Sequence, residues 1–373
     1  MTVRYIRVNP VSDMFAPAVR AYGNVAVVGR VTPPATPPAD LVAVGEAVVF
    51  TDPAEARRRA PGELGAAIAL AFTQSPGPSQ VTGVRVDSAT PDWEAGLGVL
   101  ATRDVQIVAV AATPLDSTSG ATGGAIRALA DHVAGVSSTG GDGMERIGVA
   151  MLEKASTDPT IVAGALASER MVYVAHKSDE DVAAAVAGTI AGYEPHISML
   201  LKPVKASSEP FSAAEIDALN GSETFTSGPA GMGVNWLVDP ALIPGQGVYL
   251  GEGYTGDPGG GKKYIDVVRT IDNVSFLLKA RLIRSVGAVR VSRSGLRTLG
   301  AQLEAVLDPL VRQGVIEGYE VVIPILALLD KPVRTPAEET QVNDAQAQRV
   351  VEVLVAVDYA GAIHRVALTL KFE

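Results

Sequence analysis

Residues 105–111 (VQIVAVA), 147–152 (IGVAML) and 171–175 (MVYVA) are short runs that are almost entirely apolar. Helical patterns occupy 121–136, between the first two runs, and 179–193, after the third. Strands that are apolar on both faces are typical of sheets covered by helices on both sides. This stretch therefore predicts an α/β layer built on a mostly parallel or mixed sheet.

The same alternation extends toward the N-terminus. Residues 22–31 (YGNVAVVGRV) are typical of a buried strand, and after a proline-rich loop Asp52-Pro53 has the cap and first-turn proline of a helix start. Further on, Gly and Pro become frequent in residues 194–261, where only Phe211–Leu219 is predicted to be helical. We place the end of the domain in this region, so that the predicted α/β domain spans residues 22–245.

The last third predicts a smaller α+β domain of residues 246–373. Amphipathic patterns predict helices at 270–286 and 294–314. The other predicted elements are strands at 264–268, 289–291, 315–329 and 349–359, a charged loop at 330–345, and a terminal strand at 363–373.

Both chain ends have the pattern of strands that can pair outside their own subunit. In the last segment, mostly polar residues alternate with four apolar ones: Val366, Leu368, Leu370 and Phe372. Such a strand offers an unpaired edge, which a strand exchange with a neighbouring copy would satisfy. The N-terminal segment 1–21, with Val3, Tyr5 and Ile6, is a second candidate arm, beside the C-terminal arm at about 362–373. A turn at Ala360-Gly361 equally permits an intramolecular hairpin of residues 349–373, so both alternatives stay open.

Composition argues against several kinds of site. The chain has no cysteine, which excludes disulfides, thiolate metal sites and thiol nucleophiles. Its four histidines are scattered, and His364 is expected at a solvent- or neighbour-facing strand position. No zinc-hydrolase or serine-nucleophile motif is present. We therefore expect no catalytic residue, no metal and no cofactor. We also expect no membrane insertion, because no run reaches the roughly 18 apolar residues of a membrane span.

Charge is strongly segregated along the chain. The whole chain has a formal net charge of -10 and a pI of about 5.0, yet residues 262–312 hold ten Lys or Arg against four acids. This basic segment suits a face that docks on an acidic surface. Nucleic acid is not the expected partner, because few aromatic residues interleave with the cations as stacking platforms.

Two glycine motifs leave open an alternative function, a nucleotide- or dinucleotide-binding enzyme that uses the Gly251–Gly261 loop. Gly256–Lys263 fits GxxxxGK, but Lys263 replaces the hydroxyl residue that would hold magnesium. Gly251–Gly256 fits GxGxxG, but the motif is weak in a chain of 38 glycines. A turn-rich loop is the favoured interpretation of both.

The order of these segments resembles that of contractile tail sheath proteins, especially the short form found in some phages and phage-tail-like particles. The resemblance rests on Val28-Gly29-Arg30, on 48–56 (VVFTDPAEA), 181–193 (DVAAAVAGTIAGY), 211–219 (FSAAEIDAL), 247–255 (GVYLGEGYT) and 264–270 (YIDVVRT). In the last of these, Arg269 matches a recurrent arginine. The extra outer domains of large sheaths have no counterpart in this chain.

The resemblance implies a structural subunit rather than an enzyme. Copies would polymerise around an inner tail tube protein, with strand arms from one subunit completing sheets in its neighbours, and would contract to drive the tube through a target envelope during host entry. Its partners would be itself, the tube, baseplate and tail terminator proteins, in a virion tail or an extracellular tail-like particle assembled in the host cytoplasm. The tube-facing candidates are Arg269, Lys279, Arg281, Arg284 and Arg297.

Overall fold

A computed structural model describes residues 21–138, 143–221, 232–240, 242–243, 247–257 and 259–364. These residues form two compact units. The larger, which we call the α/β unit, comprises residues 21–273 and the returning segment 361–364, and the small unit comprises residues 274–360. The division falls between Asn273 and Val274, later in the chain than the expected boundary after residue 245, because residues 247–273 pack into the α/β unit.

The α/β unit is built on a nine-stranded mixed sheet of order β2-β3-β1-β4-β5-β6-β8-β9-β7. Its parallel centre consists of β3 (Val81–Val86), β1 (Val25–Arg30), β4 (Ile107–Leu115), β5 (Ile147–Leu152), β6 (Met171–Ala175) and β8 (Val234–Val238). Antiparallel strands flank this centre: β2 (Ala47–Phe50) at one side, β9 (Val248–Leu250) and β7 (Pro203–Val204) at the other. The apolar runs thus form the predicted mixed sheet.

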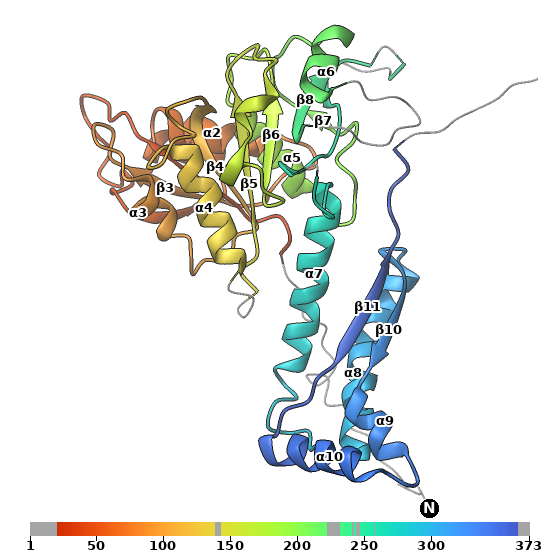
Figure 1. The fold of residues 1–373 in the computed structure, drawn as a ribbon. Helices are drawn as coiled ribbons and strands as arrows, with labels where there is room; N and C mark the ends of the chain where they lie inside the picture. The colour runs from red at the N-terminus through yellow and green to blue at the C-terminus, as the bar shows by residue number, and fades with distance from the viewer. Residues whose placement is uncertain are drawn as a thin grey trace, which may run out of the picture. The chain divides into compact units, whose positions relative to one another are not determined.

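Helices cover both faces of the sheet, as Figure 1 shows. One face packs against α2 (Glu63–Phe72) and α5 (Val182–Gly192), the other against α3 (Trp93–Gly98) and α4 (Ala125–Ser138). Each face therefore has its own apolar core. The connections add α1 (Pro53–Arg59), η2 (Pro159–Ile161), η3 (Gly164–Leu166) and α6 (Ala213–Asn220).

Side-chain caps start the helices where the sequence predicts them. Asp52 caps α1, with a proline in the first turn, by accepting a hydrogen bond from the Ala54 amide. Ser212 and Glu215 form a capping box at the start of α6.

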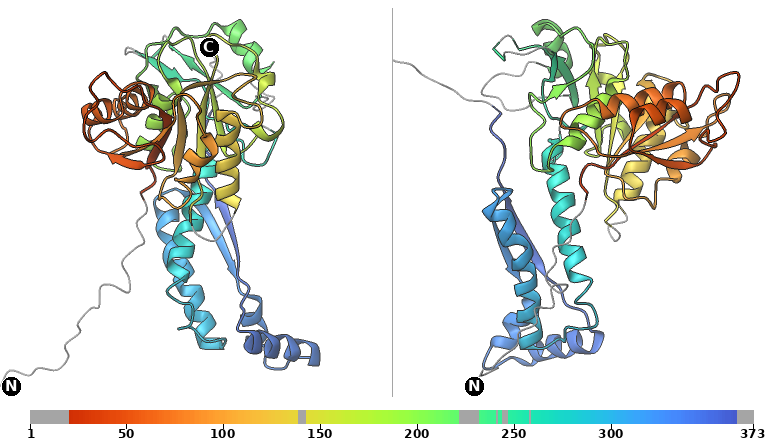
Figure 2. Two further views of the ribbon diagram at one scale, coloured as in Figure 1. Left: turned by 90° about the vertical axis from the view of Figure 1, so that its left-hand side faces the viewer. Right: turned by 180° about the vertical axis from the view of Figure 1, so that it is seen from behind.

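Helix α7 (Ile265–Leu282) links the two units, and residues after Asn273 belong to the small one. The small unit continues with α8 (Arg293–Arg312), β10 (Ile316–Val322), α9 (Pro324–Asp330), α10 (Pro336–Gln348) and β11 (Leu354–Tyr359). Strands β10 and β11 form an antiparallel pair that packs against α8 (Figure 2). Their shared core includes Leu307, Leu310 and Ile316.

Several expected elements of the last third are wrong. Residues 265–268 begin a helix rather than a strand, because Ile265 and Val268, one helical turn apart, are both buried. The expected strand 315–329 ends at Val322, and α9 follows with Pro324 at its first turn. The expected loop 330–345 contains α10, and residues 289–291 form no strand. Only the second half of 349–359 is strand.

Candidate functional site

The two-stranded β10–β11 sheet has the features of an assembly site. In the described part of the chain, each of these strands pairs only with the other, so each leaves one edge unpaired. The facing pair Val321 and Val355 packs on the small unit's core, whereas the next pair, Val322 and Leu354, is 39% and 52% exposed. A small sheet with open edges and apolar side chains on its outer face can accept further strands.

The predicted arms lie outside the described residues. Val3, Tyr5 and Ile6 of the N-terminal arm, and Val366, Leu368, Leu370 and Phe372 of the C-terminal arm, all fall in the segments 1–20 and 365–373. Their pairing with neighbouring copies therefore stays a prediction. Among the described residues, the hairpin partner of β11 is β10, and residues 361–364 form no strand.

The basic candidates do not form one exposed face. Arg269 is 6% exposed, and its guanidinium donates to the carbonyl oxygens of Tyr22 and Tyr193 inside the α/β unit. Arg269 is therefore a buried structural cation in the described subunit, not a surface one. Lys279 and Arg281 are half-buried, and Arg284 is exposed, on and just after α7. Arg297 is 62% exposed, but it pairs with Asp330 at 3.0 Å.

The expectation for His364 is also wrong. The residue lies outside any strand, and its side chain is only 14% exposed. Its ring lies against Ser198, Glu252 and Tyr264 of the α/β unit. No local sequence motif connects these four residues, which span 166 positions between Ser198 and His364.

The glycine loop packs against aromatic rings instead of forming a phosphate cradle. A Cβ on Gly251 would lie 2.3 Å from the Trp236 Nε1 atom, and one on Gly256 would lie 2.7 Å from the Tyr173 ring. Lys262, the lysine of the GxxxxGK match, forms an ion pair with Glu169 at 2.8 Å. Helix α7 does open just after the loop, as in a phosphate-binding loop, but Gly251, Gly256 and Lys262 make these other contacts. No observation here supports the nucleotide-binding alternative.

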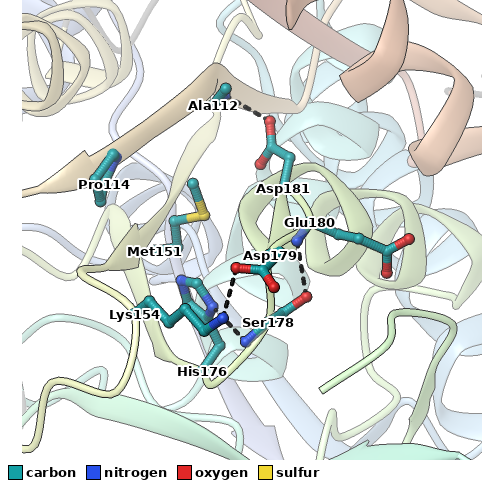
Figure 3. A pocket seen from close by; sticks show the side chains of 9 residues that line it. All are labelled: Ala112, Pro114, Met151, Lys154, His176, Ser178, Asp179, Glu180 and Asp181. Carbon is teal, nitrogen blue, oxygen red and sulfur yellow. Dashed lines mark hydrogen bonds and ion pairs between the residues drawn. The ribbon is translucent and has the colours of Figure 1, made fainter.

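An open pocket of about 250 Å³ lies at the carboxyl ends of β4, β5 and β6, the edge where open α/β sheets usually bind ligands (Figure 3). The His176 ring is held on both sides: its Nε2 lies 3.0 Å from the Leu152 carbonyl oxygen, and its Nδ1 accepts from the Ser178 amide. Burial lowers the pKa of His176, which fits a neutral ring with one donor and one acceptor nitrogen. Lys154 pairs with Asp179 at 2.5 Å.

Asp181 completes this pocket as the cap of α5. Its carboxylate accepts from the Ala112 amide at 2.7 Å and from the Ala184 amide at 3.0 Å, and burial raises its pKa. The polar groups of the pocket thus bond mainly to one another and to the backbone. The arrangement joins the end of β4 to the loops after β5 and β6, and contains no pairing of a nucleophile with a base.

Neither a metal-binding cluster nor a membrane-spanning helix is present in the part of the chain that the structure describes. No group of three or more His, Asp or Glu side chains is placed to hold a metal ion in the residues described. Within the same residues, none of the helices is both long and apolar enough to cross a bilayer.

Comparison with known proteins gives matches in structure. No protein-family model and no curated protein matches the sequence. A chain of the anti-feeding prophage baseplate aligns over 100% of this chain and 99% of its own length, with a TM-score of 0.65 and 14% identity. A chain of the sheath complex of the extracellular contractile injection system PVC, in its contracted state, aligns over 100% of this chain and 97% of its own length. Its TM-score is 0.68 and its sequence identity is 13%.

The sheath tail protein of Listeria innocua aligns over 93% of this chain and 97% of its own, with a TM-score of 0.57 and 10% identity. These alignments span both units. The chain therefore has the fold of the sheath proteins of contractile tails and injection systems.

Proposed function

We propose that this protein is a structural subunit of a contractile sheath, which polymerises around an inner tube and contracts to drive that tube through a target envelope. The observation that carries the proposal is the sheath-protein fold over the full length of the chain, at similar length in the matched proteins. The energy of contraction would be stored in the extended lattice during assembly, so the mechanism requires no nucleotide site and no catalytic residue.

The β10–β11 sheet is the proposed acceptor for the arms of adjacent copies. A two-stranded sheet is marginally stable by itself, and added strands would bury its exposed Val322 and Leu354 side chains. The apolar residues Val366, Leu368, Leu370 and Phe372 alternate with a period of two, as a strand added to such a sheet requires. The N-terminal segment with Val3, Tyr5 and Ile6 is the second proposed arm.

The proposed tube-facing cations are those of the small unit, Lys279, Arg281, Arg284 and Arg297. The proposed partners are further copies of this chain, the tube, and the baseplate and terminator proteins at the two ends. The proposed location is the tail of a virion or of an extracellular tail-like particle, after assembly in the host cytoplasm.

Deleting residues 366–373 tests the arm mechanism. The truncated protein should remain folded, with an unchanged circular dichroism spectrum, but should no longer form tubes visible by negative-stain electron microscopy. A matched control replaces the four apolar residues of this segment conservatively (Val366→Ile, Leu368→Ile, Leu370→Ile and Phe372→Tyr) and should still polymerise. Tubes of normal length from the truncated protein would exclude the proposed C-terminal arm.

A further inference from the structure

The two ends of the described chain are both held at the start of α7. On the N-terminal side, the Arg269 guanidinium donates from Nη2 to the Tyr22 carbonyl oxygen at 3.2 Å and to the Tyr193 carbonyl oxygen at 2.9 Å. On the C-terminal side, the ring of His364 contacts the ring of Tyr264, with centroids 4.8 Å apart. Tyr264 immediately precedes α7, and Arg269 is five residues further on, about 7.5 Å along a helix axis.

Burying the charged guanidinium of Arg269 costs free energy, so its hydrogen bonds to the backbone must compensate. Burial lowers its pKa to about 10, although Asp266 and Asp272 lie close enough to favour its charge. A buried cation is tolerated when it makes charge-assisted hydrogen bonds, and these are stronger than neutral ones. Arg269 donates two such hydrogen bonds, to carbonyl oxygens of segments that are far apart in the chain. One of those carbonyls belongs to Tyr22, just where the N-terminal segment joins the body.

Within residues 361–364, the side chain of His364 makes the contacts that hold the C-terminal end of the described chain. Residues 361–363 are exposed, with Ile363 at 80%, whereas the His364 side chain is 14% exposed. Its Nε2 lies 2.9 Å from the Ser198 hydroxyl, and its Nδ1 lies 3.2 Å from a Glu252 carboxylate oxygen. Both ring nitrogens are thus engaged, which fixes the orientation of the ring.

The glycine loop positions the carboxylate of this arrangement. Gly251 lies directly over the Trp236 indole, too close for any side chain, and this packing fixes the backbone at Glu252. Buried Asn235 then bonds the amide and carbonyl of Tyr254, and Tyr254 forms an isolated β-bridge with Tyr264. Gly251 of the GxGxxG pattern therefore helps to position Glu252, and Tyr254 helps to position Tyr264, where both contact His364.

We propose that Ser198, Glu252, Tyr264 and Arg269 form an anchor block that fixes both chain ends to the α/β unit at residues 22 and 364. The mechanical part of this proposal rests on the proposed function. In a lattice linked through both ends, tension that enters a subunit at one end has a short route to the other through the first turns of α7. That route bypasses the nine-stranded sheet, so the sheet need not deform when the subunits slide.

Limited trypsinolysis of the full-length protein tests the anchor block, because cleavage of a docked segment follows the population of its open form. Cleavage after Arg365 reports on the C-terminal attachment and cleavage after Arg20 on the N-terminal one, each measured by mass spectrometry relative to cleavage after exposed Arg349. His364→Ala should raise the relative cleavage after Arg365 about tenfold, as expected for two lost hydrogen bonds. The exposed control Ile363→Ala should not.

Further variants separate the contacts from general unfolding. Ser198→Ala should raise cleavage after Arg365 less than His364→Ala, and the double variant should match His364→Ala alone. Arg269→Met and Arg269→Lys should raise cleavage after Arg20 without changing cleavage after Arg365. An unchanged thermal unfolding temperature, or an unchanged rate of cleavage after Arg349, shows that this increase does not come from general unfolding. Unchanged ratios for His364→Ala and both Arg269 variants would overturn the anchor block.

The same proteins separate this inference from the proposed function. If the wild-type protein forms no tubes but the cleavage ratios change as expected, the sheath function and the load route fail while the anchor block stands. If wild-type tubes form and the cleavage ratios do not change, the anchor block alone fails. The load route itself predicts that His364→Ala tubes break or lose subunits when contraction is triggered, whereas Ile363→Ala tubes stay intact; intact His364→Ala tubes would exclude it.

Discussion

Asn235 shows how one buried polar side chain can hold three segments together. It is fully buried in β8, and its amide donates to the carbonyl oxygens of Tyr173 in β6 and Tyr254 in the glycine loop. Its own oxygen accepts from the Tyr254 amide at 2.7 Å. These bonds attach the loop to the sheet where backbone pairing ends, so the position of the loop depends on this residue.

Asn235→Ala should lower the free energy of unfolding by about 3 kcal/mol, because it removes three buried hydrogen bonds to the backbone of Tyr173 and Tyr254. Denaturant unfolding followed by circular dichroism measures the change. Asn343→Ala, at an exposed position of α10, should change stability by no more than about 0.5 kcal/mol. Equal effects of the two substitutions would show that the Asn235 bonds contribute little.

His132 makes stability depend on pH. Burial, and then the charge of nearby Arg146, lower the pKa of this histidine from 6.5 to about 4. The unfolded chain therefore binds this proton at a higher pH than the folded protein does. The contribution to stability is complete above pH 6.5 and is lost as the pH falls toward 4.

Lowering the pH from 7 to 5 should thus cost the wild-type protein about 1 kcal/mol more than it costs His132→Gln, after allowing for solvent screening of the partly exposed ring. Denaturant midpoints at the two pH values give this difference directly. A His132→Gln protein that loses as much stability as the wild type would place the pH response elsewhere.

Among the elements, the central strands and the helices that cover them are predictable from the sequence, because their burial requires continuous or periodic apolar residues. Helix α9 is not, since PILALLD is a short continuous apolar run, and periodicity cannot distinguish such a run from a strand. Helix α10 has only Val342 buried, so no apolar stripe reveals it. Its signal is the local capping box of Thr335 and Glu338, with proline in the first turn.

The features of the candidate site also differ in whether the sequence alone can predict them. The alternating pattern of the last residues and the charge segregation are visible in the sequence, because each is local. The contact of His364 with Ser198 and Glu252, and the burial of Arg269, come from tertiary packing across distant segments. A basic residue in a charged stretch looks like a surface cation until the fold encloses it.

The two faces of the β10–β11 sheet should respond differently to substitution. Val321→Asp places a charge in the small unit's core and should destabilise that unit by about 2–3 kcal/mol. Leu354→Asp lies on the exposed face and should change stability by no more than about 0.5 kcal/mol while preventing polymerisation. Thermal unfolding and negative-stain microscopy distinguish these effects. Normal tubes from Leu354→Asp would mean that this face stays open in the particle.

At the scale of the whole molecule, the segregation of charge is the basis of the proposed docking face. The acidic chain concentrates its cations in residues 262–312, and the structure places most of these in the small unit. Some are already neutralised there, since Asp330 pairs with both Arg293 and Arg297.

Replacing Arg281, Arg284 and Arg297 together by Glu should abolish assembly on the tube, by reversing the charge of the docking face. The same number of reversals in the α/β unit, at exposed Arg57, Arg103 and Lys205, should leave tube-dependent assembly in place. Co-sedimentation of each protein with preformed tubes measures the difference. Equal sedimentation of both triple variants would remove charge from the docking mechanism.

The most direct test is a cryo-electron microscopy reconstruction of the assembled protein that traces individual strands. The proposed sheath mechanism predicts that the sheet containing β10 and β11 gains strands from the chain ends of adjacent copies, with each end leaving its own subunit at residues 22 and 364. A reconstruction in which both ends of every copy fold back into their own subunit would contradict it.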